Sequence, residues 1–412
     1  MSFTDLDEQQ QANLLFFLDK SDGHELNKMK LKYEVKAGRS LKDFRQNVLD
    51  QLMTGCIPFD EFMLWLPNLH LEGNNMLFIY HPKDSLFFEQ NPMDKVYQKA
   101  LSAKEHLYNI RAGDLNKTTL VQVIQDTDKQ QIVFSFASPA QIEVKEQESE
   151  INSVVLKDDV YLSYVIMDYS LRHFVLLMHP TENLVSIRGE QKKKDWDDLH
   201  WILIKDFRTI VCDFELVKPD WLFDALHTMT EEYFHHNNPI ISDKVAAFEE
   251  RRLNNFVKGF LKTDPAFVRD IGYASRIRKA LVRTFENELI TAYGAKDSSL
   301  DFDIFSHKSD KGTTEFKTNS RGKALIFAEC GDILRLMREN GEIAALGINY
   351  KFEDNGVKKP FPYLISISGR YYSLKRTTTA STAKEVVDGV LRKLNCYKQK
   401  VQPSLASAAE NE

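Results

Sequence analysis

The chain is poor in cysteine, and the cysteines that it has are far apart. Cys56, Cys212, Cys330 and Cys396 form no CxxC pair and no spacing typical of a zinc site. The sequence therefore gives no basis for a disulfide framework or a cysteine-ligated metal. This pattern predicts a protein of the reducing cytoplasm.

Long apolar runs and phosphate-binding loops are also missing. No segment approaches the roughly 18 uninterrupted apolar residues of a membrane helix. The first residues, MSFTDLDEQQQ, lack the basic region and apolar run of a signal peptide. No GxxxxGK[ST] motif occurs, and no GxGxxG follows a predicted strand. We therefore expect no membrane partner and no nucleotide-binding P-loop.

Acidic residues are scarce only in the last third of the chain. Residues 1–250 carry 26 Lys and Arg against 41 Asp and Glu, a net charge of −15. Residues 251–400 carry 28 against 17, a net charge of +11. A basic block of this size favours contact with a polyanion such as nucleic acid. The alternative is that the two oppositely charged parts attract each other.

The length of 412 residues predicts more than one domain, and 43% hydrophobic with 28% charged residues is typical of globular proteins. We expect an α+β multidomain protein with an acidic mixed module over 1–150 and a β-rich module over 151–218. A helical connector over 219–274 and a basic domain over 275–400 follow. The small, polar tail 401–412 is expected to be disordered.

Apolar periodicity predicts individual elements in the acidic part. A helix is expected over 40–53, with Ser40 as its N-cap and Phe44, Val48 and Leu52 on one face. The polar segment 141–153 is expected to be an exposed connector. Apolar and β-branched content predicts further strands at 31–37, 76–81, 119–126, 131–137 and 209–217.

The basic part has a more informative order of elements. A helix begins at Ser275, and its end at 289–294, LITAYG, fits either helix or a short strand. Two strands joined by a polar turn follow, SLDFDIFSH and GTTEFKT. A helix over 321–340, strands within 342–352 and 362–375, and a closing helix over 380–397 complete the domain.

This order, with Asp303, Glu315 and Lys317 on the paired strands, resembles the PD-(D/E)xK nuclease superfamily over about a quarter of the chain. The proline of the family's name is absent, because Leu300, Asp301 and Phe302 precede Asp303. The resemblance implies an αβββαβ, restriction-endonuclease-like domain at residues 275–400.

The resemblance also implies catalytic roles for Asp303, Glu315 and Lys317. Asp303 and Glu315 would be metal ligands, joined by Glu288 or its neighbour Glu286 on the preceding helix. Asp301 shares a strand face with Asp303, so it is an alternative or additional ligand. The implied cofactor is Mg²⁺ or Mn²⁺.

The chemistry explains these residue types. Mg²⁺ prefers carboxylate oxygens and keeps several waters, one of which it activates for attack on a phosphodiester. The two-residue period of a strand places Glu315 and Lys317 on one face, where the lysine can offset developing phosphate charge. The simpler alternative is a solvated hairpin face.

Basic side chains near the motif are candidates for nucleic-acid contact. Those on the helix give it one basic side suited to phosphates, and two more follow the motif. A plain solvated face is the alternative. These candidates are Arg276, Arg278, Lys279, Arg283, Arg321 and Lys323.

A second metal candidate lies on a predicted helix. His227, Glu231 and His235 are spaced four residues apart, so they would share a helical face, with His236 nearby. An exposed helix that happens to carry histidines is the alternative interpretation.

We therefore expect a cytoplasmic, metal-dependent nuclease acting on DNA, with N-terminal sensing or assembly modules. Bacterial defence against phage is one setting in which such a domain joins an unfamiliar module. The alternatives are a non-catalytic nucleic-acid-binding protein and a protein-interaction adaptor. In the last case the acidic N-terminal region would bind a protein partner or a second copy of the chain.

Overall fold

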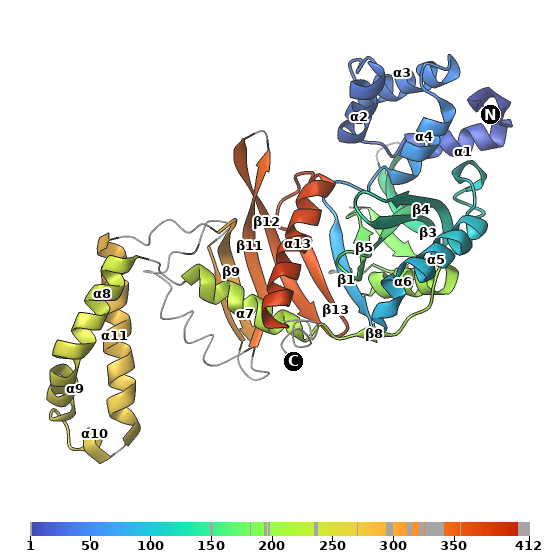
Figure 1. Ribbon diagram of the computed structural model, residues 1–412. Helices are drawn as coiled ribbons and strands as arrows, with labels where there is room; N and C mark the ends of the chain where they lie inside the picture. Colours follow the sequence, from blue (N-terminus) through green and yellow to red (C-terminus); the bar gives the residue numbers. More distant parts are fainter. Residues whose placement is uncertain are drawn as a thin grey trace. The chain divides into compact units, whose positions relative to one another are not determined.

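A computed structural model (Figure 1) describes the chain except for residues 1, 149–150, 182, 193–195, 197, 235–237, 270, 294–299, 311–314, 321–324, 326–341, 355 and 403–412. The protein is α+β. Its contacts define two compact units, Met1–Pro219 with Ser368–Asp388, and Asp220–Ile367 with Gly389–Glu412. In the part of the chain that is described, no helix has the length and hydropathy needed to cross a membrane.

The first unit begins with four helices: α1 (Glu8–Leu18), α2 (Gly23–Tyr33), α3 (Leu41–Met53) and α4 (Phe59–Trp65). The predicted helix at 40–53 is confirmed: the Ser40 side chain accepts a hydrogen bond from the Asp43 amide, and Phe44, Val48 and Leu52 are buried. The strand expected at 31–37 is wrong. Capped at Asp22, α2 continues to Tyr33 and leaves Leu31 84% exposed.

An antiparallel sheet forms the body of the first unit. Its strand order is β13 (Tyr371–Arg376), β1 (Met76–Pro82), β5 (His173–Met178), β4 (Ile151–Asp168), β3 (Gln131–Glu148), β6 (Leu184–Ile187) and β7 (Glu190–Gln191). β2 (Thr119–Asp126) pairs with β3, and β8 (Leu216–Val217) pairs with β1. Residues 76–80 are all buried, so both faces of β1 are covered.

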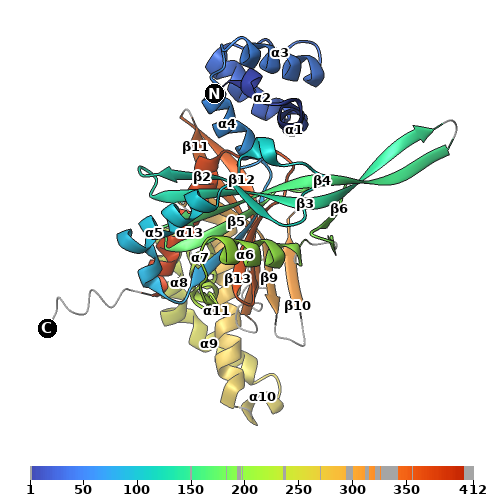
Figure 2. The same cartoon turned by 90° about the vertical axis from the view of Figure 1, so that its right-hand side faces the viewer.

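Apart from residues 149–150, which lie outside the described residues, the polar segment 141–153 is not a connector. It belongs to β3 and β4, which pair from Gln131↔Asp168 to Glu148↔Ile151. Figure 2 shows this two-stranded ribbon extending beyond the neighbouring strands. The modules expected at 1–150 and 151–218 therefore share one sheet, because the ribbon's strands lie on either side of residue 150.

An aromatic core holds α5 (Gln90–Ala103) and α6 (Leu199–Ile210) to this sheet. Phe174 and Phe214 stack with ring centroids 4.4 Å apart, and the Phe207 ring of α6 packs against Phe174 at 5.5 Å. The strand expected over 209–217 is therefore wrong except at Leu216–Val217, which form β8. Burial of Leu203, Ile204 and Phe207 on one side of a helix decides the structure there.

The strands of the second unit lie side by side in the order β10 (Glu315–Asn319), β9 (Phe302–Asp310), β11 (Glu342–Asp354) and β12 (Val357–Ser368). The pairs β9–β10, β9–β11 and β11–β12 are antiparallel. The strand expected within 362–375 is two strands, because β12 ends at Ser368 and β13 begins at Tyr371.

Two helices of the second unit are tied together by a charged network. α7 (Trp221–Phe234) packs against β9 and β11. The Glu232 carboxylate accepts hydrogen bonds from the Tyr397 hydroxyl and the Lys400 ammonium of α13 (Lys384–Val401), both at 2.6 Å. The Tyr397 ring also contacts Phe302 of β9, with centroids 6.3 Å apart.

A pair of long helical segments projects from the second unit (Figure 1). One consists of α8 (Pro239–Phe248), a π-helical turn (Glu249–Leu253) and α9 (Asn254–Leu261). The short α10 (Ala266–Arg269) leads to the other, α11 (Ile271–Tyr293). The short strand considered at LITAYG is absent, because residues 289–293 belong to α11 and Leu289 and Ile290 pack against Ile241 of α8.

Candidate functional site

The hairpin register separates the backbone positions of the two residues expected to share a metal. Glu315 lies opposite Asp310, and Asn319 lies opposite Ser306. Asp303 is seven residues before Asp310 on the same strand, roughly 23 Å away at about 3.3 Å per residue. Ligand oxygens must lie within about 2.6 Å of a hard cation. This register is not the one that a metal site shared by Asp303 and Glu315 would need, so that site remains a prediction without support from the strand pairing.

Asp303 of β9 and Asp301, which lies just before this strand, have cationic partners instead. The Lys351 ammonium lies 2.8 Å from Asp303 Oδ1, with about a quarter of each side chain exposed. The Lys393 ammonium of α13 lies 2.6 Å from Asp301 Oδ1. Each carboxylate is therefore neutralised by a lysine from a packed neighbour, which is a structural role for both.

The remaining motif residues are dispersed. Lys317 is exposed and lies opposite Lys308 in the hairpin. Glu288 is exposed on α11, which packs against α8 and α9. Arg321 and Lys323 lie outside the described residues. The described part of the chain therefore does not show the catalytic group implied by the family resemblance.

The basic residues predicted on the helix do share a surface. Arg276, Arg278 and Lys279 are exposed on α11, and Arg283 is half-buried. Arg276 holds its guanidinium 4.4 Å from the centroid of the Tyr273 ring, and Arg278 donates a hydrogen bond to the Asn254 side chain of α9. Side-chain contacts thus orient two of the four basic groups.

The distal part of the helical pair, residues 251–283, is called the basic arm below. It carries nine Lys and Arg against two Asp, a net charge of +7. Aromatic rings join its segments: Phe267 lies 5.5 Å from Phe260 and 5.1 Å from Tyr273, centroid to centroid. Phe256 is nevertheless 57% exposed and Phe260 47% exposed. The arm therefore combines a surplus of cations with accessible aromatic surface.

The histidine candidate on α7 is only partly described. His227 Nδ1 lies 3.8 Å from Glu231 Oε2 on an exposed helix face, whereas His235 and His236 lie outside the described residues. No protein-family model matches the chain, and no curated protein matches its sequence.

A pocket of about 320 Å³ in the first unit was not predicted. Lys20, Asp159, Tyr161 and the histidines His70 and His179 are among its lining residues. The two imidazoles stack with centroids 4.4 Å apart, and Lys20 forms an ion pair with Asp159 beside them. The pocket thus places two aromatic bases next to a fixed ion pair.

Burial controls the protonation of both imidazoles. It lowers the pKa of His70 to about 3 and also lowers the pKa of His179. Both rings are therefore neutral at pH 7. The Asn75 amide nitrogen donates to the carbonyl oxygens of His70 and Leu71, so Asn75 Oδ1 accepts from His179 Nδ1 at 3.2 Å. This bond places the proton of His179 on Nδ1 and the lone pair on Nε2.

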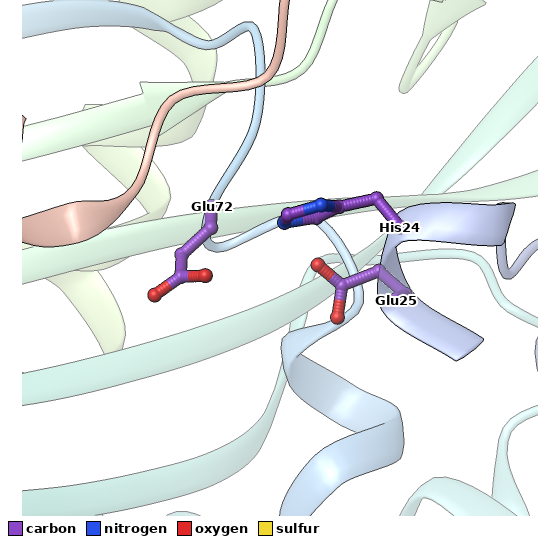
Figure 3. Close-up of side chains that lie close together, drawn as sticks. All are labelled: His24, Glu25 and Glu72. Atoms are coloured by element: carbon purple, nitrogen blue, oxygen red, sulfur yellow. The ribbon is translucent and has the colours of Figure 1, made fainter. Parts of the chain in front are cut away.

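The first unit also contains a cluster of charged groups, drawn in Figure 3. His24 and Glu25 lie in the first turn of α2, and Glu72 lies in the loop before β1. Their ligating atoms all lie within 4.8 Å of one another. The Lys28 ammonium lies 2.8 Å from Glu25 Oε1 and 2.7 Å from Glu72 Oε2.

Burial dominates the electrostatics of Glu25, which is only 2% exposed. It raises the pKa of Glu25 to about 7 despite the opposing hydrogen bond from Lys28. Sequence reasoning missed this cluster and the pocket because their members come from segments up to 160 residues apart. The one local signal is Asp22, a helix N-cap residue, just before His24 and Glu25.

Proposed function

We propose that this protein binds nucleic acid through its basic arm. The observation that carries the proposal is the net charge of +7 over residues 251–283, with Arg276, Arg278 and Lys279 exposed on α11. Neutralising phosphates with Lys and Arg releases condensed counterions, which supplies most of the affinity in sequence-independent binding.

The spacing of the basic residues supports contact with a phosphate backbone. Arg276, Lys279 and Arg283 are three and four residues apart, so they lie on one side of α11. That stripe covers roughly 10 Å along the helix axis, enough to meet more than one phosphate. These are phosphate contacts, which position a nucleic acid without reading its sequence.

The exposed aromatic residues favour a single strand over a duplex. Phe256 and Phe260 are four residues apart on α9, so they share a helical face. Unstacked bases gain about 1–3 kcal/mol each by stacking on such rings, whereas the bases of a duplex are already stacked. We therefore propose single-stranded nucleic acid as the preferred partner.

The proposal includes no cleavage at Asp303. A phosphodiesterase centre of the implied type needs two carboxylates on one ion, and the register places Glu315 opposite Asp310 rather than near Asp303. The nuclease alternative therefore has less support than binding alone.

Fluorescence anisotropy with labelled single-stranded and duplex DNA of equal length tests the proposal. The wild-type chain should bind at low salt, with an affinity that falls as salt rises. Arg276→Glu combined with Lys279→Glu should weaken binding and reduce the log–log salt slope by about 2, roughly one per lost phosphate contact.

The matched control places the same charge change on an exposed surface of the first unit, Lys36→Glu with Lys42→Glu. This variant should keep the wild-type salt slope. Equal losses in both variants would mean that net charge, not the basic arm, governs binding. Absence of binding at 50 mM salt would remove the proposed function.

The β3–β4 ribbon favours a second candidate function, protein interaction. Among the described residues, the strand partners of 144–148 lie in 151–155 of the same ribbon, and Val154 and Leu156 are 58% and 54% exposed. An isolated two-stranded ribbon with exposed apolar residues gains stability when another surface covers it. We propose a second copy of the chain as that surface. Light scattering should then show a dimer that Leu156→Asp dissociates, and a wild-type monomer at all concentrations would exclude it.

A further inference from the structure

We infer that His24, Glu25 and Glu72 form a binding site for a divalent transition-metal ion in the first unit. The site is independent of the basic arm and of the proposed nucleic-acid binding, since its residues belong to a different compact unit. It also differs from the metal site expected at Asp303.

The first argument is geometric. One nitrogen or oxygen from each of the three side chains lies within 4.8 Å of the others. Ligands at about 2.0–2.2 Å from one ion lie roughly 3–4 Å apart. Small side-chain rotations therefore suffice to bring all three atoms onto a common ion. Figure 3 shows the side chains converging from two segments, the start of α2 and the loop that carries Glu72.

The second argument concerns an unpaired atom. Glu25 is only 2% exposed, and among the described atoms its Oε2 has no hydrogen-bond partner. A buried carboxylate oxygen without a partner loses its hydration with no compensating hydrogen bond. A cation bound at the cluster would remove that cost. The backbone holds Glu25 in place, because its amide donates to the Asp22 side chain at 2.9 Å.

The third argument is that a cation already lies between the two carboxylates. The Lys28 ammonium contacts Glu25 Oε1 at 2.8 Å and Glu72 Oε2 at 2.7 Å. Its side chain is 37% exposed on a flexible stem, so it can swing toward solvent when a metal enters. Lys28 therefore acts as a competing counterion that lowers the affinity for the metal and stabilises the empty site.

The donor set selects the class of ion. One imidazole nitrogen and two carboxylate oxygens suit zinc or manganese and leave coordination positions for water. Mg²⁺ prefers oxygen donors alone, so the imidazole discriminates against it.

Calorimetric titration of the untagged, full-length chain with Zn²⁺, and separately with Mg²⁺, tests the site. The wild-type chain should bind one Zn²⁺ at this site and show a higher Tm with it. His24→Ala and Glu72→Gln should each weaken Zn²⁺ binding at least tenfold. The matched controls, His106→Ala and Glu89→Gln, change exposed residues outside the cluster and should bind like the wild type.

Lys28→Met keeps the test informative if His24→Ala or Glu72→Gln fails to fold. Without metal this variant should have a lower Tm, because two carboxylates lose their counterion. Zn²⁺ should bind it several-fold more tightly than the wild type and restore the Tm. A lower Tm that Zn²⁺ does not restore, or wild-type binding that survives both His24→Ala and Glu72→Gln, would overturn the inference.

Discussion

The Lys351 ammonium of β11 donates a hydrogen bond to the Asp303 carboxylate of β9 at 2.8 Å. This contact gives Asp303 a structural role in place of the expected metal. The double-mutant cycle of Asp303→Asn and Lys351→Met should therefore show a coupling of about 0.5–1 kcal/mol in urea unfolding, as for partly exposed ion pairs.

The control cycle uses Asp354 and Lys359, whose charged atoms lie 2.7 Å apart but whose side chains are 44% and 54% exposed. Solvent screens that pair more strongly, so its coupling should be close to zero. Equal couplings in the two cycles would show that burial does not strengthen the Asp303 pair.

The same contact predicts how Asp303 responds to magnesium. If the carboxylate is a structural ion-pair partner, Asp303→Asn changes stability without changing metal binding. Thermal melts of wild type and variant, each with and without millimolar Mg²⁺, should give the same metal-induced change in Tm. If Mg²⁺ raised the Tm of the wild type but not of Asp303→Asn, Asp303 would be a metal ligand.

The sequence was sufficient where local pattern decides structure. The helix at 40–53 followed from Ser40 and the spacing of Phe44, Val48 and Leu52, and all three apolar residues are buried. The strands at 76–81 and 119–126 followed from runs of apolar and β-branched residues, and β1 and β2 occupy those positions. Such elements depend on neighbours within a few residues.

The sequence was insufficient where pairing decides geometry. In an antiparallel hairpin the numbers of opposite residues have a constant sum, and Glu315 opposite Asp310 fixes that sum at 625. Asp303 and Glu315 sum to 618, which places them seven residues out of register. The two predicted strands exist and pair, but β9 continues through Asp310, into residues that were expected to form the turn. The register also depends on the turn. The cluster around Glu25 is harder still, because Glu72 reaches it only through tertiary folding.

Gly347 of β11 occupies a position with no room for a side chain. A Cβ there would lie 2.8 Å from two ring carbons of Phe305 and 2.8 Å from Ser306 Cβ, both on the paired strand β9. Gly347→Ala should therefore lower the free energy of unfolding by about 1–3 kcal/mol, the usual cost of overpacking. Urea denaturation followed by circular dichroism measures this loss.

Gly259 is the matched control for that substitution. It lies inside α9, and a Cβ there would have no atom within 4 Å. Gly259→Ala should stabilise the helix by up to about 1 kcal/mol, because alanine has the higher helix propensity. Destabilisation of similar size in both variants would indicate that steric contact at Gly347 is not the cause.

His200 should make the stability of the first unit depend on pH. The side chain is fully buried between Phe78 and Tyr371, each with ring centroids 4.4 Å from the imidazole. The Tyr80 hydroxyl lies 2.6 Å from His200 Nδ1, and His200 Nε2 has no hydrogen-bond partner among the described atoms. Burial lowers the pKa of His200 to about 3, below the value of 6.5 for an unperturbed histidine.

The sign of the effect follows from which state binds the proton. Between pH 6.5 and about 3, the unfolded chain protonates His200 and the folded chain does not. The stability due to neutral His200 is therefore complete above pH 6.5 and is lost as the pH falls, by up to about 1.4 kcal/mol per unit. His200→Phe keeps the stacking but removes the titration. Between pH 7 and pH 5, the wild type should lose about 2 kcal/mol more than this variant in urea unfolding. If the wild type and His200→Phe lost equal free energies of unfolding, other groups, such as His70, would account for the acid sensitivity.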